Sequence, residues 1–89
     1  MIMDKLHIIT FNVKGLKDDL KRMKFFTWCR TKKLDIICIQ EAHCELSTIE
    51  KWKEEWQGDI IASYGTNNSK GTCIMFRPNL EYKLISEKI

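Results

Sequence analysis

At 89 residues the chain is shorter than most domains, which run to about 100–150 residues, so one small domain is the most that it can form. Its composition, with 44% hydrophobic and 30% charged residues and a single proline, is that of a globular protein and excludes a disordered chain. The 15 basic and 12 acidic residues give a formal charge of +3, too small to indicate a dedicated nucleic-acid-binding protein.

The first two predicted strands are apolar runs that each end at a polar side chain. Residues 6–11 run into Asn12, and residues 34–40 run into Glu41. Between them, residues 16–33 contain neither glycine nor proline, which predicts a helix. The strands of such a unit lie parallel and are joined by a crossover that is right-handed in nearly every known case. We therefore expect Asn12 and Glu41 side by side at the carboxyl ends of the strands, where open α/β sheets bind ligands.

The predicted helix over residues 16–33 has two apolar stripes and a basic surface. One stripe consists of Phe25, Trp28 and Cys29, and the other of Leu16, Leu20 and Met23. A helix with two apolar faces is expected to be covered on both. The basic residues within 17–24 and 30–33 are interpreted as a solvated helix face, with phosphate contact as the second possibility.

A second helix is predicted to begin at Ser47, because Ser47 and Glu50 have the spacing of a capping box, and to end at Gly58. The residues beyond it predict three strands and a turn-rich loop: strands over 59–63, 72–76 and 82–85, with a polar loop over 64–71.

The cysteines and histidines offer other chemistry, which the pattern does not favour. No signal peptide precedes the four cysteines, so reduced thiols in an intracellular protein, nuclear or cytoplasmic, fit better than disulfides. No apolar stretch approaches the length of a membrane span. A zinc site would need Cys38, His43, Cys44 and Cys73, which lack paired ligand spacing.

His7 and His43 are weighed as substitute bases, and a surface or satisfied strand position is the better interpretation of His7. His43 has no oriented acidic partner in the sequence pattern. The three tryptophans, at 28, 52 and 56, fit core packing better than base stacking. Glu41 taken alone would be an ordinary loop carboxylate.

Several short motifs carry a family resemblance through their order. They are Phe11-Asn12-Val13-Lys14-Gly15-Leu16, Lys21-Arg22, Trp28, Gln40-Glu41-Ala42-His43 and the glycine-led strand at 71–76. The chain resembles the N-terminal part of the endonuclease/exonuclease/phosphatase superfamily. It looks most like the apurinic-type endonuclease domain of LINE-type retrotransposon reverse transcriptase polyproteins. The resemblance implies an α/β fold, the N-terminal portion of a two-sheet, DNase I-like sandwich with flanking helices.

The same resemblance implies a Mg²⁺-dependent phosphodiesterase that cleaves DNA. The residue matching Glu41 would ligate the metal, and the residue matching Asn12 would lie beside the metal and the scissile phosphate, so both are candidate catalytic and metal-binding residues. This agrees with the preference of Mg²⁺ for one or two carboxylates completed by water and phosphate. Ala42 stands where that motif commonly has threonine.

The later motifs of that family, a tyrosine, an Asp-x-Asn pair and a terminal Asp and His, have no counterpart in the sequence. Residues 1–89 are therefore expected to form a partial domain without the C-terminal catalytic part. We expect no DNA cleavage by the chain alone, and DNA as partner only if further sequence completes the site.

Two other functions stay open. The chain could be a non-enzymatic module that binds nucleic acid through Lys14, Lys17, Lys21 and Arg22, or binds a partner or itself through an uncovered sheet. It could also be an enzyme of the same superfamily that acts on a phospholipid or inositol phosphate. The Lys21-Arg22 pair and the Gln-Glu-x-His segment favour the nucleic-acid branch.

Overall fold

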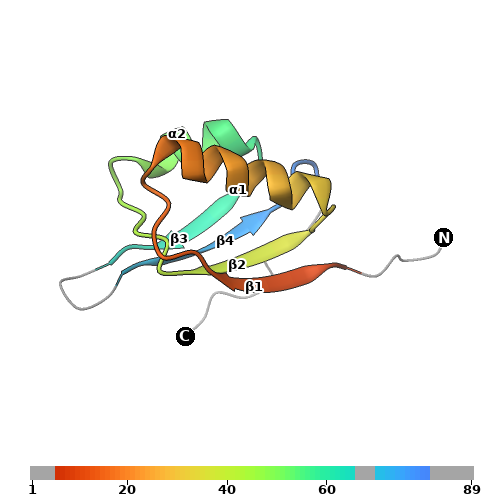
Figure 1. Cartoon of the computed structure of the whole chain (residues 1–89), viewed down its shortest axis with the longest axis horizontal. Coiled ribbons are helices and arrows are strands. Elements are labelled where there is room, and N and C mark those ends of the chain that lie inside the picture. Colours follow the sequence, from red (N-terminus) through yellow and green to blue (C-terminus); the bar gives the residue numbers. More distant parts are fainter. Residues whose placement is uncertain (1–5, 66–69, 81–89) are drawn as a thin grey trace.

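The computed structural model describes residues 6–65 and 70–80, which form a mixed four-stranded sheet with two helices on one face (Figure 1). The elements in chain order are β1 Ile8–Asn12, α1 Asp19–Thr31, β2 Ile36–Gln40, α2 Ile49–Trp56, β3 Ile60–Ser63 and β4 Thr72–Phe76. The predicted strand at 82–85 lies outside the described residues, as do residues 66–69 of the predicted loop. Within the described part of the chain, no helix is long and apolar enough to cross a membrane.

The sheet has the order β1-β2-β4-β3, and its first pair is parallel. Ile8 pairs with Ile36 and Asn12 with Gln40, while α1 crosses over between the two strands. Strand β4 is antiparallel to both β2 and β3. The expected α/β fold and the parallel pairing of the first two strands are thus confirmed.

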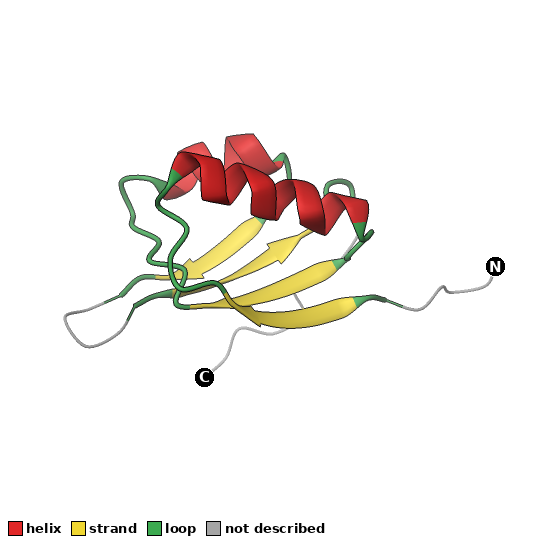
Figure 2. Ribbon diagram, in the orientation of Figure 1, coloured by secondary structure: helices red, strands yellow, loops and turns green. Residues whose placement is uncertain are grey.

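The core lies between the sheet and the two helices, which Figure 2 shows on the same side. Alternate strand residues point toward the helices, so Ile37 and Ile39 of β2 are buried while Gln40 is exposed. Trp52 and Trp56 of α2 are buried against this face, which confirms their expected core role. The third tryptophan, Trp28, is 37% exposed and packs on Phe25 and Phe11 at the β1 edge.

The expectation that α1 is covered on both faces is wrong for the described residues. Its buried side chains are Arg22, Phe26 and Cys29, whereas Leu20 and Met23 are 54% and 58% exposed. The cause is the layer arrangement: α1 has the sheet on one side and α2 beside it, and no described element packs on its outer side.

The interpretation of residues 17–24 as a solvated basic face is wrong for Arg22, which is 2% exposed. Its Nε and Nη2 donate to the Glu55 carboxylate at 2.6 and 3.0 Å, and Nη2 also donates to Asp19 at 2.5 Å. Nη1 donates to the Leu16 carbonyl oxygen at 2.9 Å, and the guanidinium lies 5.3 Å from the Trp52 ring centroid. These bonds, chiefly those to Glu55, raise the pKa of Arg22. Arg22 therefore ties α1 to α2 and to the preceding loop.

The N-cap of helix α2 lies one residue later than the capping-box spacing predicts. Thr48 is its N-cap residue and makes no side-chain cap hydrogen bond. The Thr48 hydroxyl instead donates to the Glu45 carbonyl oxygen at 3.3 Å, within a turn that precedes the helix. The capping box at Ser47 and Glu50 is therefore wrong. The helix ends at Trp56, before Gln57 with its left-handed φ of +63°.

The sheet face opposite the helices has no covering layer among the described residues. Its outward positions, by strand alternation, are Ile8, Thr10, Asn12, Ile36, Cys38, Gln40, Ile61, Ser63, Thr72, Ile74 and Phe76. We call this set the open face. None of these residues is charged, and Ile8, Ile61 and Ile74 are 59%, 46% and 37% exposed. An apolar, uncharged sheet face is typical of an interface.

Replacing Arg22 should destabilise the fold strongly. Arg22→Met keeps the apolar stem but leaves the Leu16 carbonyl oxygen unpaired, and we expect the free energy of unfolding to fall by about 2–3 kcal/mol. Urea denaturation followed by circular dichroism measures it. Lys24→Met, on the exposed side of the same helix, is the matched control and should change this free energy by about 0.5 kcal/mol or less. Equal stability of the two variants would contradict the structural role of Arg22.

Candidate functional site

The carboxyl ends of β1 and β2 bring together the two side chains that the sequence singled out. The Asn12 Nδ2 atom donates a hydrogen bond to Glu41 Oε2 at 2.7 Å. Asn12 is the last residue of β1 and pairs with Gln40, the last residue of β2, which Glu41 directly follows. The expected proximity of these residues is confirmed, and their catalytic and metal-binding roles stay predictions.

Backbone hydrogen bonds between the two segments continue past the strands. They run from Val13 N to Gln40 O (3.2 Å), from Gly15 N to Glu41 O (2.6 Å) and from Leu16 N to Ala42 O (3.0 Å). These backbone hydrogen bonds hold the turns after β1 and β2 against each other. The side chains on the turns therefore start from a fixed backbone.

Left-handed backbone conformations are concentrated in these turns. Lys14, Glu41 and His43 have φ values of +54°, +52° and +57°, and Gly15 has +95°. Non-glycine residues adopt positive φ only when surrounding structure imposes it, at a cost of about 1–3 kcal/mol each. Such strain is concentrated at ligand-binding and catalytic sites in proteins, which makes this end of the sheet the candidate functional site.

The orientation of the Asn12 amide is determined by its neighbours. The Lys14 backbone N–H donates to Asn12 Oδ1 at 3.1 Å, while the other end of the amide faces the Glu41 carboxylate. Because only oxygen can accept from an N–H and only nitrogen can donate to a carboxylate, one amide orientation satisfies both contacts. Asn12 therefore presents a donor to Glu41.

A third segment supports Glu41 from the side of β4. Ala42 N donates to the Gly71 carbonyl oxygen at 3.0 Å, and His43 N donates to the Lys70 carbonyl oxygen at 2.7 Å. The His43 ring lies against Gly15, where an added Cβ would be 2.9 Å from its Nδ1 atom. Its Nε2 atom is buried and has no hydrogen-bond partner among the described residues. His43 thus packs the two turns together and does not offer an exposed base.

Lys21 was considered from the sequence only as a family-motif residue and a possible nucleic-acid contact, and its contact in the site was not predicted. Its ammonium group donates to the carbonyl oxygens of Val13 and Lys14 at 2.6 and 3.2 Å, directly behind Asn12. Its place in the first turn of the helix after the loop was the available signal, because side chains there can reach back to loop carbonyls. The basic composition of residues 17–24 instead favoured the interpretation of a solvated helix face.

Residues 9–87 match the Endonuclease/Exonuclease/phosphatase family. The chain belongs to this family. The match includes both strand ends, with Asn12 and Glu41, and it supports the family-level part of the resemblance. It does not assign the chain to retrotransposons.

Members of the family generally depend on Mg²⁺, and the candidate site fits such an ion in part. Glu41 supplies a half-buried carboxylate, whose Oε1 has no hydrogen-bond partner among the described residues. Mg²⁺ often binds through one or two carboxylates and keeps several waters, so the Glu41 carboxylate alone could supply the protein ligand of such an ion, with the Asn12 amide nitrogen hydrogen-bonded to it. The described residues contain no group of three or more His, Cys, Asp or Glu side chains arranged to hold a metal.

The cysteines do not provide a competing site. All four are free, and burial raises the pKa of Cys29 and of Cys73 to about 12. The pKa of Cys44 is also raised by burial. Thiols with raised pKa values stay protonated at neutral pH, whereas nucleophilic attack needs the thiolate.

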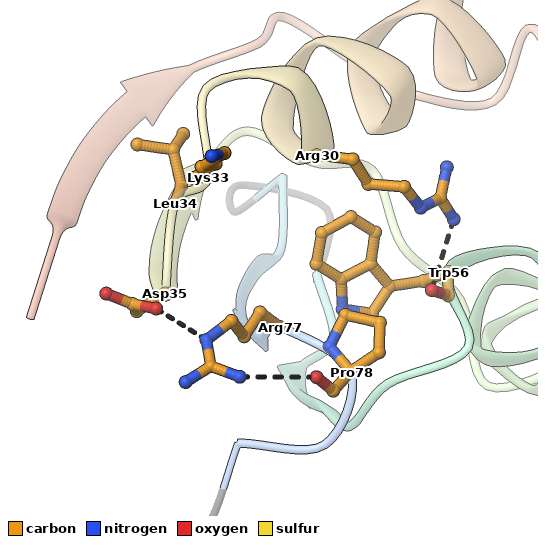
Figure 3. Close-up of a pocket in the computed structure, with 7 residues that line it drawn as sticks. All are labelled: Arg30, Lys33, Leu34, Asp35, Trp56, Arg77 and Pro78. Atoms are coloured by element: carbon orange, nitrogen blue, oxygen red, sulfur yellow. Dashed lines mark hydrogen bonds and ion pairs between the residues drawn. The ribbon is translucent and has the colours of Figure 1, made fainter.

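A pocket of about 350 Å³ lies at the other end of β2 (Figure 3). Its lining residues are Arg30, Lys33, Leu34, Asp35, Trp56, Arg77 and Pro78. Arg77 Nε donates to Asp35 Oδ1 at 2.6 Å, and Arg30 Nη2 donates to the Trp56 carbonyl oxygen at 3.1 Å. These contacts join β2, β4 and the helix ends. The pocket precedes β2, whereas Glu41 follows it, so it is separate from the candidate site.

Adding a methyl group at Gly15 should disturb the contact between the two turns. Gly15→Ala must adopt a φ near +95° and place its Cβ against His43, so we expect a loss of about 1–3 kcal/mol in the free energy of unfolding. Chemical denaturation measures the loss. In the Gly15→Ala/His43→Ala double variant the contact is relieved while the φ strain stays, so the two losses should be less than additive. Wild-type stability of Gly15→Ala would contradict the described turn.

The stability of the fold should fall in acid, in part through Asp35. The backbone N–H of His7, followed by Arg77, lowers the pKa of Asp35 below its ordinary value of 3.8. A lowered folded-state pKa contributes stability that is complete above the ordinary value and is lost as the pH falls through the lowered one. We expect Asp35→Asn to reduce the slope of unfolding free energy against pH below about 4. Glu54→Gln, an exposed control, should leave that slope unchanged.

Proposed function

We propose that this chain contributes the metal-binding end of a Mg²⁺-dependent phosphodiesterase that acts on DNA, of the apurinic-type endonuclease branch found in LINE-type retrotransposons. The observation that carries the proposal is the hydrogen bond between Asn12 and Glu41 at adjacent parallel strand ends. Ligands of open α/β sheets bind outside the carboxyl ends of strands, which is where this pair lies.

Each residue has a role that follows from its contacts. Glu41 would hold the ion through its carboxylate, one oxygen of which already accepts from Asn12. The Asn12 amide nitrogen carries two hydrogens, so one can orient Glu41 while the other remains for a phosphate oxygen. When bound, Mg²⁺ supplies positive charge that stabilises the phosphate as water attacks it.

Hydrolysis also needs a group that accepts a proton from the attacking water. Apart from Glu41, no acidic or imidazole side chain of the described residues makes a hydrogen bond with Asn12 or Glu41. The His43 Nε2 atom is buried. The proposed site is therefore incomplete in acid–base chemistry, and the purified chain with Mg²⁺ should not nick supercoiled DNA above background.

The contacts of the basic residues favour an enzyme site over a module that binds nucleic acid by charge alone. Arg22 is buried, Lys21 is bonded to loop carbonyls, and Lys17 pairs with Glu45 at 3.1 Å. Of the four basic residues first considered, Lys14 alone makes no side-chain hydrogen bond or ion pair within the described residues, and it lies two residues after Asn12. A phospholipid or inositol phosphate as substrate is the alternative within the same family.

The metal proposal predicts that Glu41→Gln weakens Mg²⁺ binding by about tenfold or more, because the variant removes the carboxylate and keeps the shape. A titration with MgCl₂ followed by ¹H–¹⁵N NMR measures the affinity from shifts at residues 12–16 and 40–43. Glu54→Gln changes the net charge equally and is the matched control. Shifts confined to other residues, or equal affinities of the two variants, would contradict a metal at Glu41.

We also propose that the open face associates with the open face of a second copy. The absence of charged residues from it supports this, because two identical faces would meet without repulsion, and its isoleucines would leave water. Interdigitating apolar side chains are the usual contact between two packed sheets.

The association proposal predicts a concentration-dependent dimer or larger species in sedimentation velocity, together with binding of an apolar dye. Ile74→Lys places a charge in the middle of the open face and should shift the distribution toward monomer. Leu46→Lys is the matched control, since Leu46 is 75% exposed in the segment between β2 and α2. A clean wild-type monomer without dye binding would refute the proposal.

A further inference from the structure

The side chain of Lys21 is placed behind the Asn12–Glu41 pair by the start of α1. Asp18 is the N-cap residue, and its carboxylate accepts from the Lys21 backbone N–H at 2.8 Å. From this fixed point the Lys21 ammonium reaches back to Val13 O at 2.6 Å and Lys14 O at 3.2 Å. One cation therefore holds two successive carbonyl groups of the turn that follows β1.

These two carbonyl groups need such a partner. Both carbonyl oxygens point toward the Lys21 ammonium group. Lys14, the residue between the two carbonyl groups, has a φ of +54°. Converging carbonyl dipoles repel each other, and a hydrogen bond from an ammonium group is stronger than one from water or a neutral donor. Without Lys21 the turn would lose the contact that offsets this repulsion.

The turn in turn determines the orientation of Asn12. The Lys14 N–H belongs to the peptide whose carbonyl, Val13 O, is the closer of the two acceptors of Lys21. That N–H donates to Asn12 Oδ1, and this contact leaves Asn12 Nδ2 directed at Glu41. A displacement of this one peptide would free the amide to rotate. A continuous series of hydrogen bonds thus connects Lys21 to the Glu41 carboxylate.

We propose that Lys21 is a positioning residue: it fixes the peptide between residues 13 and 14, and thereby keeps the Asn12 amide hydrogen-bonded to Glu41. Its effect on a bound metal rests on the proposed function, whereas its effect on the Asn12 amide does not. The competing role for Lys21 is direct contact with a phosphate group of DNA. In that case its removal would weaken DNA binding and leave the Asn12 amide as it is.

The Asn12 side-chain amide can be observed directly in assigned ¹H–¹⁵N NMR spectra of the full chain. Glu41→Ala removes the acceptor and gives the reference position of an amide that is not bonded to a carboxylate. We expect Lys21→Met to move the Asn12 Nδ2 resonances more than half of the way to this reference position. Lys24→Met, a neighbour on the exposed side of the same helix, should leave them at the wild-type position. Lys21→Arg, which retains charged donors, should restore most of the wild-type position.

Wild-type Asn12 resonances in Lys21→Met would overturn the proposal, and so would equal displacements in Lys21→Met and Lys24→Met. If Lys21→Met does not fold, Lys21→Gln, which keeps a neutral donor, replaces it with the same expected direction and the same overturning result. A MgCl₂ titration of the same samples separates the two proposals. Weaker Mg²⁺ binding in Lys21→Met, by about tenfold, supports both. A displaced amide together with no Mg²⁺ binding in the wild type would leave Lys21 as a positioning residue and refute the proposed function.

Discussion

The parallel pairing of β1 with β2, extended by backbone hydrogen bonds past both strand ends, is the constraint on which the rest of the structure depends. This pairing requires a crossover, which α1 supplies. It also brings two turns that are distant in sequence into hydrogen-bonding contact with each other. The strained backbone at Lys14 and Glu41 persists because each turn is held by the other. The candidate site is therefore a consequence of sheet topology and not of a separate loop structure.

The helix layer supports this arrangement through a polar contact at its centre. Burial of Arg22 is tolerated because its donors are matched by Glu55, Asp19 and loop carbonyls, and because Glu55 remains 37% exposed and so is only partly desolvated. One guanidinium thereby joins α1, α2 and the segment that leads from the site. Trp52 and Trp56 belong to the same buried apolar cluster as residues of β2 and β4, so they pack the helix layer onto the sheet. The open face, in contrast, has no described helix or strand packed on it.

The elements that position the site could be predicted because they depend on local patterns. Two apolar runs, a helix-length segment between them and a polar residue after each run are sufficient for a parallel pair with Asn12 beside Glu41. The functions of Lys21 and Arg22 could not be predicted, since a long basic side chain has the same sequence pattern whether it is solvated, buried or bonded to a loop. The start of α2 was mispredicted for a similar reason: Thr48 and Ser47 are both suitable caps, and the turn at Glu45 decides between them.

Crystals of the chain grown with MnCl₂ would test the central claim most directly, because Mn²⁺ prefers the same oxygen ligands as Mg²⁺ and scatters X-rays anomalously. The account predicts an anomalous difference peak next to the Glu41 carboxylate, with Asn12 Nδ2 still hydrogen-bonded to the same side chain. A peak at another cluster of carboxylates with none at Glu41, or a structure in which Asn12 and Glu41 are apart, would contradict it.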